Sequence, residues 1–198
     1  MNIKHAMKET LGDAGDIRLN DVEIRFESIR AVMINEVVPE NPEDDFYADP
    51  GELYLSTALA LFKKAGLDVN GIQDVLDMGI YVTNAVKTPK AEYTISKSEM
   101  ERSLPWLEKE LSLFPNVRVI MLMGDVAKKM FNQIVKSRTK KNAVPSGATY
   151  KIRQTPFYVG DKRIMPSYII TGGNILIEKS KCTMIAEDIQ TMYNLIKE

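Results

Sequence analysis

Residues 32–45 read Val-Met-Ile-Asn-Glu-Val-Val-Pro-Glu-Asn-Pro-Glu-Asp-Asp, an apolar run followed by an acidic segment with two prolines. An apolar run bounded by residues typical of turns predicts a buried strand that ends in a loop. The segment 50–66 then has Leu55, Leu59 and Phe62 on one helical face, with two lysines shortly before its final glycine, as is common at helix C-termini. A strand, a loop and a helix therefore open the predicted domain.

The same alternation continues along the chain. Further strands are expected at residues 79–84, 117–123 and 162–170, and helices from a capping box at Ser96 and Glu99 to about residue 113, from an N-cap at Asp125, and over residues 187–196. Alternating strands and helices predict an α/β fold. We expect one domain over residues 1–198, a three-layer α/β/α sandwich with a central, mainly parallel four-stranded sheet.

Ligands of such sheets bind beyond the carboxyl ends of the strands. This rule brings together three loops that are distant in sequence, at residues 35–47, 84–90 and 171–180. A polar, basic segment at residues 136–147 is expected to be a surface loop.

The composition excludes several classes of protein. Lys and Arg number 26 and Asp and Glu 27, for a net charge of -1, so binding to nucleic acid through bulk charge is excluded while a local basic patch is not. One cysteine, Cys182, allows no intramolecular disulfide and no four-thiolate metal site. The one histidine, His5, lies in a polar N-terminal segment that we expect to be mobile. We expect a cytoplasmic protein that does not bind a membrane, because neither a membrane span nor a signal-peptide core is evident.

Three motifs, in this order, are similar to those of the uracil-DNA glycosylase superfamily, most closely its iron-sulfur-containing branch. The first is Val32-Met33-Ile34-Asn35-Glu36-Val37-Val38-Pro39, with Glu43-Asp44-Asp45 and Asp49-Pro50-Gly51. The second is Tyr81-Val82-Thr83-Asn84-Ala85-Val86-Lys87, and the third is Pro105-Trp106-Leu107-Glu108-Lys109-Glu110-Leu111 followed by Gly124-Asp125-Val126-Ala127. The resemblance covers residues 29–198 and implies hydrolysis of an N-glycosidic bond in DNA.

The chain also departs from that branch. Thr88 and Ser103 stand at two positions where the branch has cysteine ligands, so we expect no cluster, and we expect no other cofactor or metal. Ile169 stands at the position of the family's late histidine, which donates to the leaving base. Thr171, Asn174 or the backbone amides of residues 172–173 would have to replace that donor, whose loss typically costs about 100- to 1000-fold in rate.

Glycosidic hydrolysis needs a carboxylate that activates water or stabilises the sugar cation, and donors for the departing base. The resemblance and the strand ends give Glu36, Asn35 and Thr171 as catalytic candidates, with Glu43, Asp44 and Asp45 as weaker ones. The alternative for the acidic residues is a solvated loop. Asn84 is the candidate for holding a base edge, because an amide both donates and accepts, although strand-end asparagines often only form turns.

A flipped base is commonly stacked on an aromatic ring, for which the resemblance indicates Phe46 or Tyr47; either could instead close the loop onto the core. The candidate DNA contacts are basic residues and the glycine turn: Lys87, Lys140, Lys141, Gly172, Gly173, Asn174 and Lys179. An ordinary solvated loop is the alternative for the lysines.

The expected function is release of uracil or another deaminated or damaged base from DNA. The alternatives are an inactive member of the fold that binds a nucleobase or nucleic acid, and a small-molecule enzyme acting on nucleotides. The expected partner is uracil-containing or single-stranded DNA, or a free nucleobase, bound by a monomer.

Overall fold

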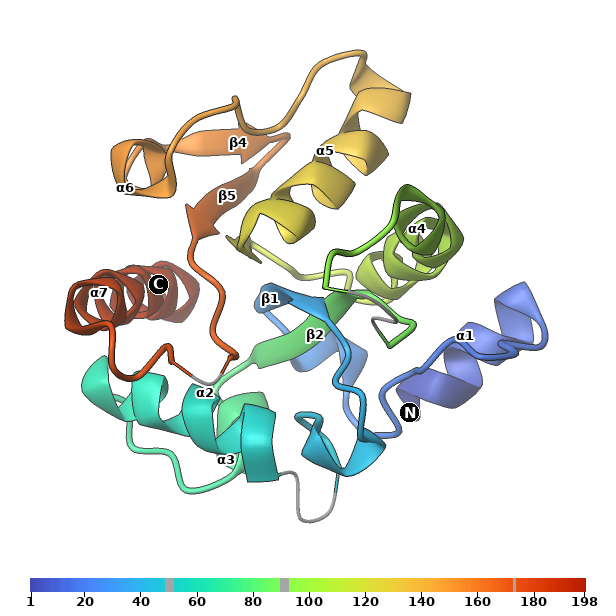
Figure 1. The fold of residues 1–198 in the computed structure, drawn as a ribbon, viewed down its shortest axis with the longest axis horizontal. Coiled ribbons are helices and arrows are strands. Elements are labelled where there is room, and N and C mark those ends of the chain that lie inside the picture. The colour runs from blue at the N-terminus through green and yellow to red at the C-terminus, as the bar shows by residue number, and fades with distance from the viewer. Residues whose placement is uncertain (49–51, 90–92, 173) are drawn as a thin grey trace.

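The computed structural model describes residues 1–48, 52–89, 93–172 and 174–198. These form a five-stranded sheet in the order β2-β1-β3-β5-β4 (Figure 1). Four strands run parallel: β1 (Ala31–Val37), β2 (Ile80–Val86), β3 (Val119–Met123) and β5 (Lys162–Ser167). The mainly parallel sheet is confirmed, but it has a fifth strand, the short β4 (Phe157–Val159), which pairs antiparallel with β5 at the edge.

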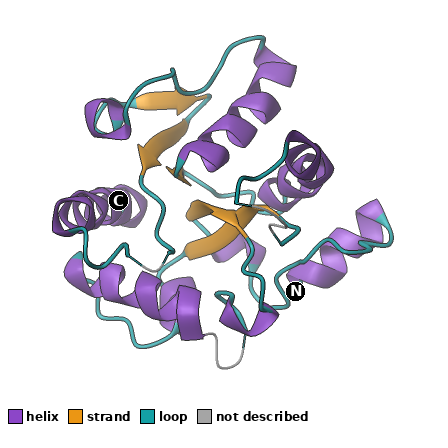
Figure 2. Ribbon diagram, in the orientation of Figure 1, coloured by secondary structure: helices purple, strands orange, loops and turns teal. Residues whose placement is uncertain are grey.

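Helices cover both faces of the sheet, which confirms the α/β/α arrangement (Figure 2). One face carries α1 (Ile3–Leu11), α4 (Lys97–Ser112) and α5 (Asp125–Thr139), and the other carries α2 (Glu52–Lys64) and α7 (Lys179–Lys197). Each face has its own apolar core. The shorter elements are α3 (Ile72–Asp77), α6 (Thr149–Ile152) and the 3-10 turns η1 (Phe26–Ser28) and η2 (Pro42–Asp44). None of the helices in the described segments is both long and apolar enough to cross a membrane.

The local signals explain most element boundaries. In α4 the predicted capping box is present: Glu99 N donates to Ser96 Oγ at 3.1 Å, and Ser96 N donates to Glu99 Oε2 at 2.8 Å. The helix α5 has Gly124 at its N-cap, so the expected N-cap at Asp125 is wrong, and Asp125 is the first residue of the helix. The helix continues to Thr139, so the first residues of the predicted loop 136–147 are helical. The terminal helix α7 begins eight residues earlier than the amphipathic pattern indicated.

The N-terminal segment is not the mobile segment we expected. It forms α1, whose Ile3 and Met7 side chains are fully buried against the core on the α4 side. The Asn2 side chain accepts a hydrogen bond from His5 N at 3.0 Å, as an N-cap does. Asn2 also forms an isolated bridge with Glu23. The apolar spacing at residues 3, 6 and 7 is the sequence signal for this helix.

Candidate functional site

The carboxyl ends of β1 and β2 place two asparagines side by side, because Asn35 and Asn84 are register partners. Asn35 Nδ2 donates to Asn84 Oδ1 at 3.1 Å and to Thr171 Oγ1 at 2.8 Å, and Asn35 Oδ1 accepts from Ile170 N at 3.4 Å. All three polar residues are buried. The structure therefore brings together three predicted site residues from the first, second and last of the three loops.

Asp45 completes this arrangement, which we call the polar cluster (Asn35, Asp45, Asn84 and Thr171). Asp45 Oδ1 accepts from Asn84 Nδ2 at 3.0 Å and from its neighbour Phe46 N at 2.9 Å. Burial raises the pKa of the Asp45 carboxyl above its ordinary value of 3.8. A carboxyl group with a raised pKa beside a polar cluster is typical of functional sites.

Glu36, the first choice for the catalytic carboxylate, lies elsewhere. Successive side chains of a strand point to opposite faces, so Asn35 and Glu36 diverge. Glu36 Oε1 accepts from Val126 N at 3.3 Å in the first turn of α5, and Gly124 leaves room for it, because a Cβ there would lie 2.5 Å from that oxygen. Glu36 is thus bound to a helix N-terminus, where a carboxylate is stabilised by the helix dipole. Its catalytic role stays a prediction.

The two aromatic candidates differ in accessibility. Phe46 is fully buried and packs on Tyr54, with ring centroids 5.4 Å apart. Tyr47 is half-buried, its ring stacks on Tyr81 at 5.6 Å, and its hydroxyl accepts from Val82 N at 3.0 Å. Both rings close the acidic loop onto the core in this conformation, and Tyr47 lines a cavity that also adjoins Asp45.

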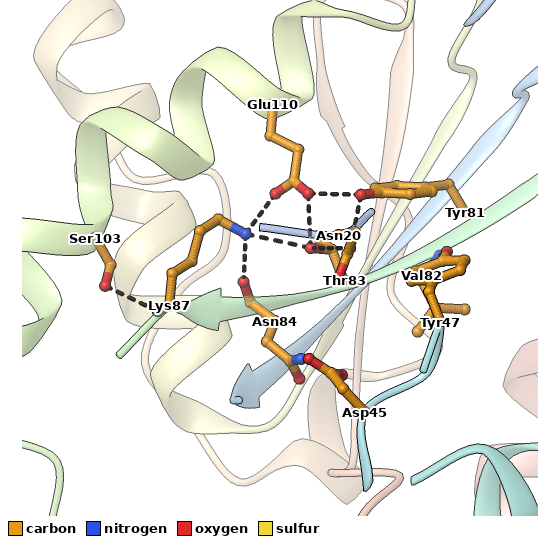
Figure 3. A network of polar contacts seen from close by, with 10 residues as sticks. All are labelled: Asn20, Asp45, Tyr47, Tyr81, Val82, Thr83, Asn84, Lys87, Ser103 and Glu110. Atoms are coloured by element: carbon orange, nitrogen blue, oxygen red, sulfur yellow. Dashed lines mark hydrogen bonds and ion pairs between the residues drawn. The ribbon is translucent and has the colours of Figure 1, made fainter. Parts of the chain in front are cut away.

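A buried ionic network lies behind Asn84 (Figure 3). Lys87 Nζ is 2.6 Å from Glu110 Oε2 and donates to the Asn84 carbonyl at 2.9 Å. Tyr81 and Thr83 donate to the other Glu110 oxygen at 2.6 and 2.9 Å. Lys87 is 2% exposed. In this conformation the side chain faces Glu110 and not solvent, and its expected contact with a DNA phosphate stays a prediction.

The residues at the expected cluster-ligand positions do not fit an iron-sulfur cluster. Ser103 Oγ accepts from Lys87 N at 2.9 Å. Thr88 is buried, and its side chain has a hydroxyl in place of a thiol. Such clusters are held by thiolates. The one thiol, Cys182, is buried on α7 across the sheet, where it donates to Ile175 O.

The other DNA-contact candidates separate into two groups. Lys140 and Lys141 follow α5, which rises about 22 Å from the β3 end over its 15 residues, so they lie toward the opposite edge of the sheet from the polar cluster. The final turn of α5 shares a cavity with Lys162, where β5 starts. The exposed Gly172, Asn174 and Lys179 belong to the loop that starts at Thr171 and to the first residue of α7. Gly173 and the motif residues 49–51 lie outside the described residues.

The same loop carries two exposed apolar side chains that sequence reasoning missed. Leu176 is 50% exposed and Ile177 is 73% exposed. Ile177 N donates to Asn174 O at 3.0 Å, so a turn presents these side chains just beyond Thr171. The sequence signal was an apolar pair, Leu176-Ile177, between a glycine turn and a lysine-rich segment.

Fold and site together define a class: an α/β/α sandwich whose parallel strands end in a buried polar cluster beside an acidic loop. Residues 37–176 match the family model described as the uracil DNA glycosylase superfamily, and the chain belongs to this family. No curated protein matches the chain. The residues before 37, including α1, lie outside the matched region.

Proposed function

We propose that the protein hydrolyses the N-glycosidic bond of uracil or another deaminated base in DNA. The observation that carries this proposal is the convergence of Asn35, Asn84 and Thr171 with the Asp45 carboxylate at one sheet edge. Family membership supports the reaction class. Asn84 is 1% exposed in this conformation, so a base reaches its amide only after the groups that cover it move.

Three members of the polar cluster take part in this chemistry, and Asn35 positions two of them through its hydrogen bonds to Asn84 and Thr171. The Asn84 amide has one further lone pair and one further hydrogen, which suit the donor-acceptor edge of a pyrimidine. Asp45 accepts a proton from water as its oxygen bonds to the sugar C1′, and the C1′–N bond breaks to release the base as an anion. Thr171 Oγ1 accepts from Asn35, and its own O–H, which also interacts with the Tyr54 hydroxyl, is the donor that we assign to the departing base.

Release of free uracil from a uracil-containing oligonucleotide is the direct test. We expect turnover by the wild type and a loss of about 30- to 150-fold in kcat/KM for Asn84→Ala, because the base loses a buried hydrogen-bonding partner worth about 2 to 3 kcal/mol. Asn132→Ala is the matched control, since the Asn132 amide bonds the Val144 backbone far from the cluster. Equal rates for both variants would contradict the role of Asn84.

The exposed apolar pair predicts a preference that depends on strand context. Apolar side chains that enter a base stack help to open a duplex, which costs a few kcal/mol per step. We expect Ile177→Ala to lower uracil release from duplex DNA by roughly 10-fold and to leave release from single-stranded DNA within about 2-fold. Tyr158→Ala, an exposed aromatic on β4, serves as control. An equal loss on both substrates would argue against a wedge.

A protein that binds the base without turnover is the second candidate. Ile169 favours it, because isoleucine cannot donate to the departing base. Under this alternative, uracil-containing DNA raises the melting temperature, no uracil is released, and Asn84→Ala still weakens binding. Turnover by the wild type excludes it.

A further inference from the structure

A cavity of about 400 Å³ lies between the N-terminal segment (residues 1–21) and the acidic loop at residues 42–48. Its lining includes three cations, an amide, two carboxylates and a tyrosine: Lys4, Lys8, Arg18, Asn20, Asp21, Asp45 and Tyr47. Because Asp45 also accepts from Asn84, the cavity adjoins the polar cluster. A nucleotide whose base lies at Asp45 therefore has its sugar and phosphate near these cations.

The charges in the cavity are only partly compensated. Lys4 Nζ lies 3.2 Å from Asp21 Oδ2 and forms an ion pair with it. Arg18 donates to two backbone carbonyls of the acidic loop, at Pro39 O (2.5 Å) and Glu40 O (3.0 Å). Across the described segments, no carboxylate lies within ion-pair distance of Lys8 or Arg18, although Asp21 also lines the cavity and the Lys8 charge contributes to lowering the pKa of Asp21. The lining therefore carries three cations against two carboxylates, an excess of one positive charge.

The N-terminal segment holds these groups in place. Arg18 N donates to the Lys87 carbonyl at 2.7 Å, and Asn20 Nδ2 donates to Tyr81 Oη at 2.7 Å and Thr83 Oγ1 at 3.2 Å. The Asn20 contacts join the segment to β2, and the Arg18 contact joins it to Lys87, the residue that follows β2. All of these contacts lie near Asn84. The backbone that carries Arg18 is thus fixed relative to the polar cluster, as a binding site requires.

We infer that Lys8 and Arg18 bind a nucleotide phosphate next to the base held at the polar cluster. The ligand is an anion because the lining carries more cations than carboxylates, and the cavity volume suits about one nucleotide. This inference rests on the proposed function for the identity of the base. It adds a DNA contact outside residues 37–176, on a part of the chain that the family match does not include.

The test measures binding of a fluorescent single-stranded thymidine oligonucleotide, which contains no uracil, at salt concentrations from roughly 50 to 300 mM. The quantity compared is the salt slope, the slope of the logarithm of the binding constant against the logarithm of the salt concentration. We expect Lys8→Gln to weaken binding by about 3- to 10-fold at low salt and to reduce the salt slope by about 0.7, the value for one phosphate of a single strand. Lys151→Gln, an exposed cation on α6, is the matched control.

If the salt slope of oligonucleotide binding is the same in Lys8→Gln, in Lys151→Gln and in the wild type, the inference is overturned, whatever the outcome for uracil release. A reduced slope with no uracil release by the wild type would retain the phosphate site and refute the glycosylase. Competition by thymidine monophosphate that weakens in Lys8→Gln would identify a free nucleotide as a ligand. Loss confined to the oligonucleotide would identify a strand phosphate, and either result supports the site. A reduced slope in Lys140→Gln/Lys141→Gln but not in Lys8→Gln would place the contact on the opposite edge and overturn it.

Discussion

Asp45→Asn is expected to lower kcat/KM for uracil release by about 100- to 10,000-fold, the usual contribution of a general base. The replacement keeps the shape of the side chain and an oxygen that accepts from Asn84 Nδ2, so the polar cluster stays connected. What it removes is the ability to accept a proton from water. Uracil release under single-turnover conditions measures this loss without interference from product release.

The pH profile gives a second measurement on the same carboxyl group. Burial raises the pKa of Asp45 above 3.8, so wild-type kcat/KM falls as the pH decreases through that raised value, where the carboxyl takes up a proton. The folded state holds this proton more tightly than the unfolded chain. The ionised form therefore lowers stability above the raised pKa, and stability increases as the pH decreases through it. We accordingly expect Asp45→Asn to be no less stable than the wild type at pH 7.

Glu36→Gln is the matched control, because it removes the competing carboxylate on the opposite face of β1. We expect it to retain most of the activity and to destabilise the protein by about 0.5 to 1 kcal/mol through the weaker interaction with the start of α5. The reverse result, with activity lost in Glu36→Gln and retained in Asp45→Asn, would assign the catalytic carboxylate to Glu36.

The sequence predicted what depends on local pattern. Apolar runs located the parallel strands, the Ser96 capping box located α4, and the rule of carboxyl strand ends brought Asn35, Asn84 and Thr171 to one place. The strand period of two also implies that Asn35 and Glu36 point to opposite faces of β1, so that one of them and not the other faces the polar cluster.

What the sequence did not predict depends on partners distant in the chain. Lys87 looked like a surface cation because lysines usually are, and its burial follows from Glu110 on α4, 23 residues further along. The strand β4 has three residues, too few for a period-2 signal, and it forms because β5 offers an edge. The cavity at Asp45 requires the N-terminal segment, whose role is set by its contacts with β2.

The Lys87–Glu110 ion pair leads to the largest expected effect on stability. Lys87 and Glu110 are 2% and 1% exposed, and Glu110 also accepts from Tyr81, whose pKa is raised well above 10.0 by burial, so that its hydroxyl keeps the proton it donates. Removing one partner leaves a buried charge without its counterion. We expect Lys87→Met to lower the free energy of unfolding by about 3 to 5 kcal/mol in urea titrations.

The double variant Lys87→Met/Glu110→Gln distinguishes the effect of the charges from the effect of side-chain packing. Without either charge, the glutamine oxygen still accepts from Tyr81 and Thr83, so we expect the double variant to be more stable than Lys87→Met alone. Lys97→Met is the surface control, because the exposed pair of Lys97 and Glu101 is worth about 0.5 kcal/mol or less. A loss below about 1 kcal/mol in Lys87→Met would contradict an uncompensated buried charge.

Because Lys87 Nζ also donates to the Asn84 carbonyl, a stable double variant with reduced uracil release would show that the ion pair positions Asn84.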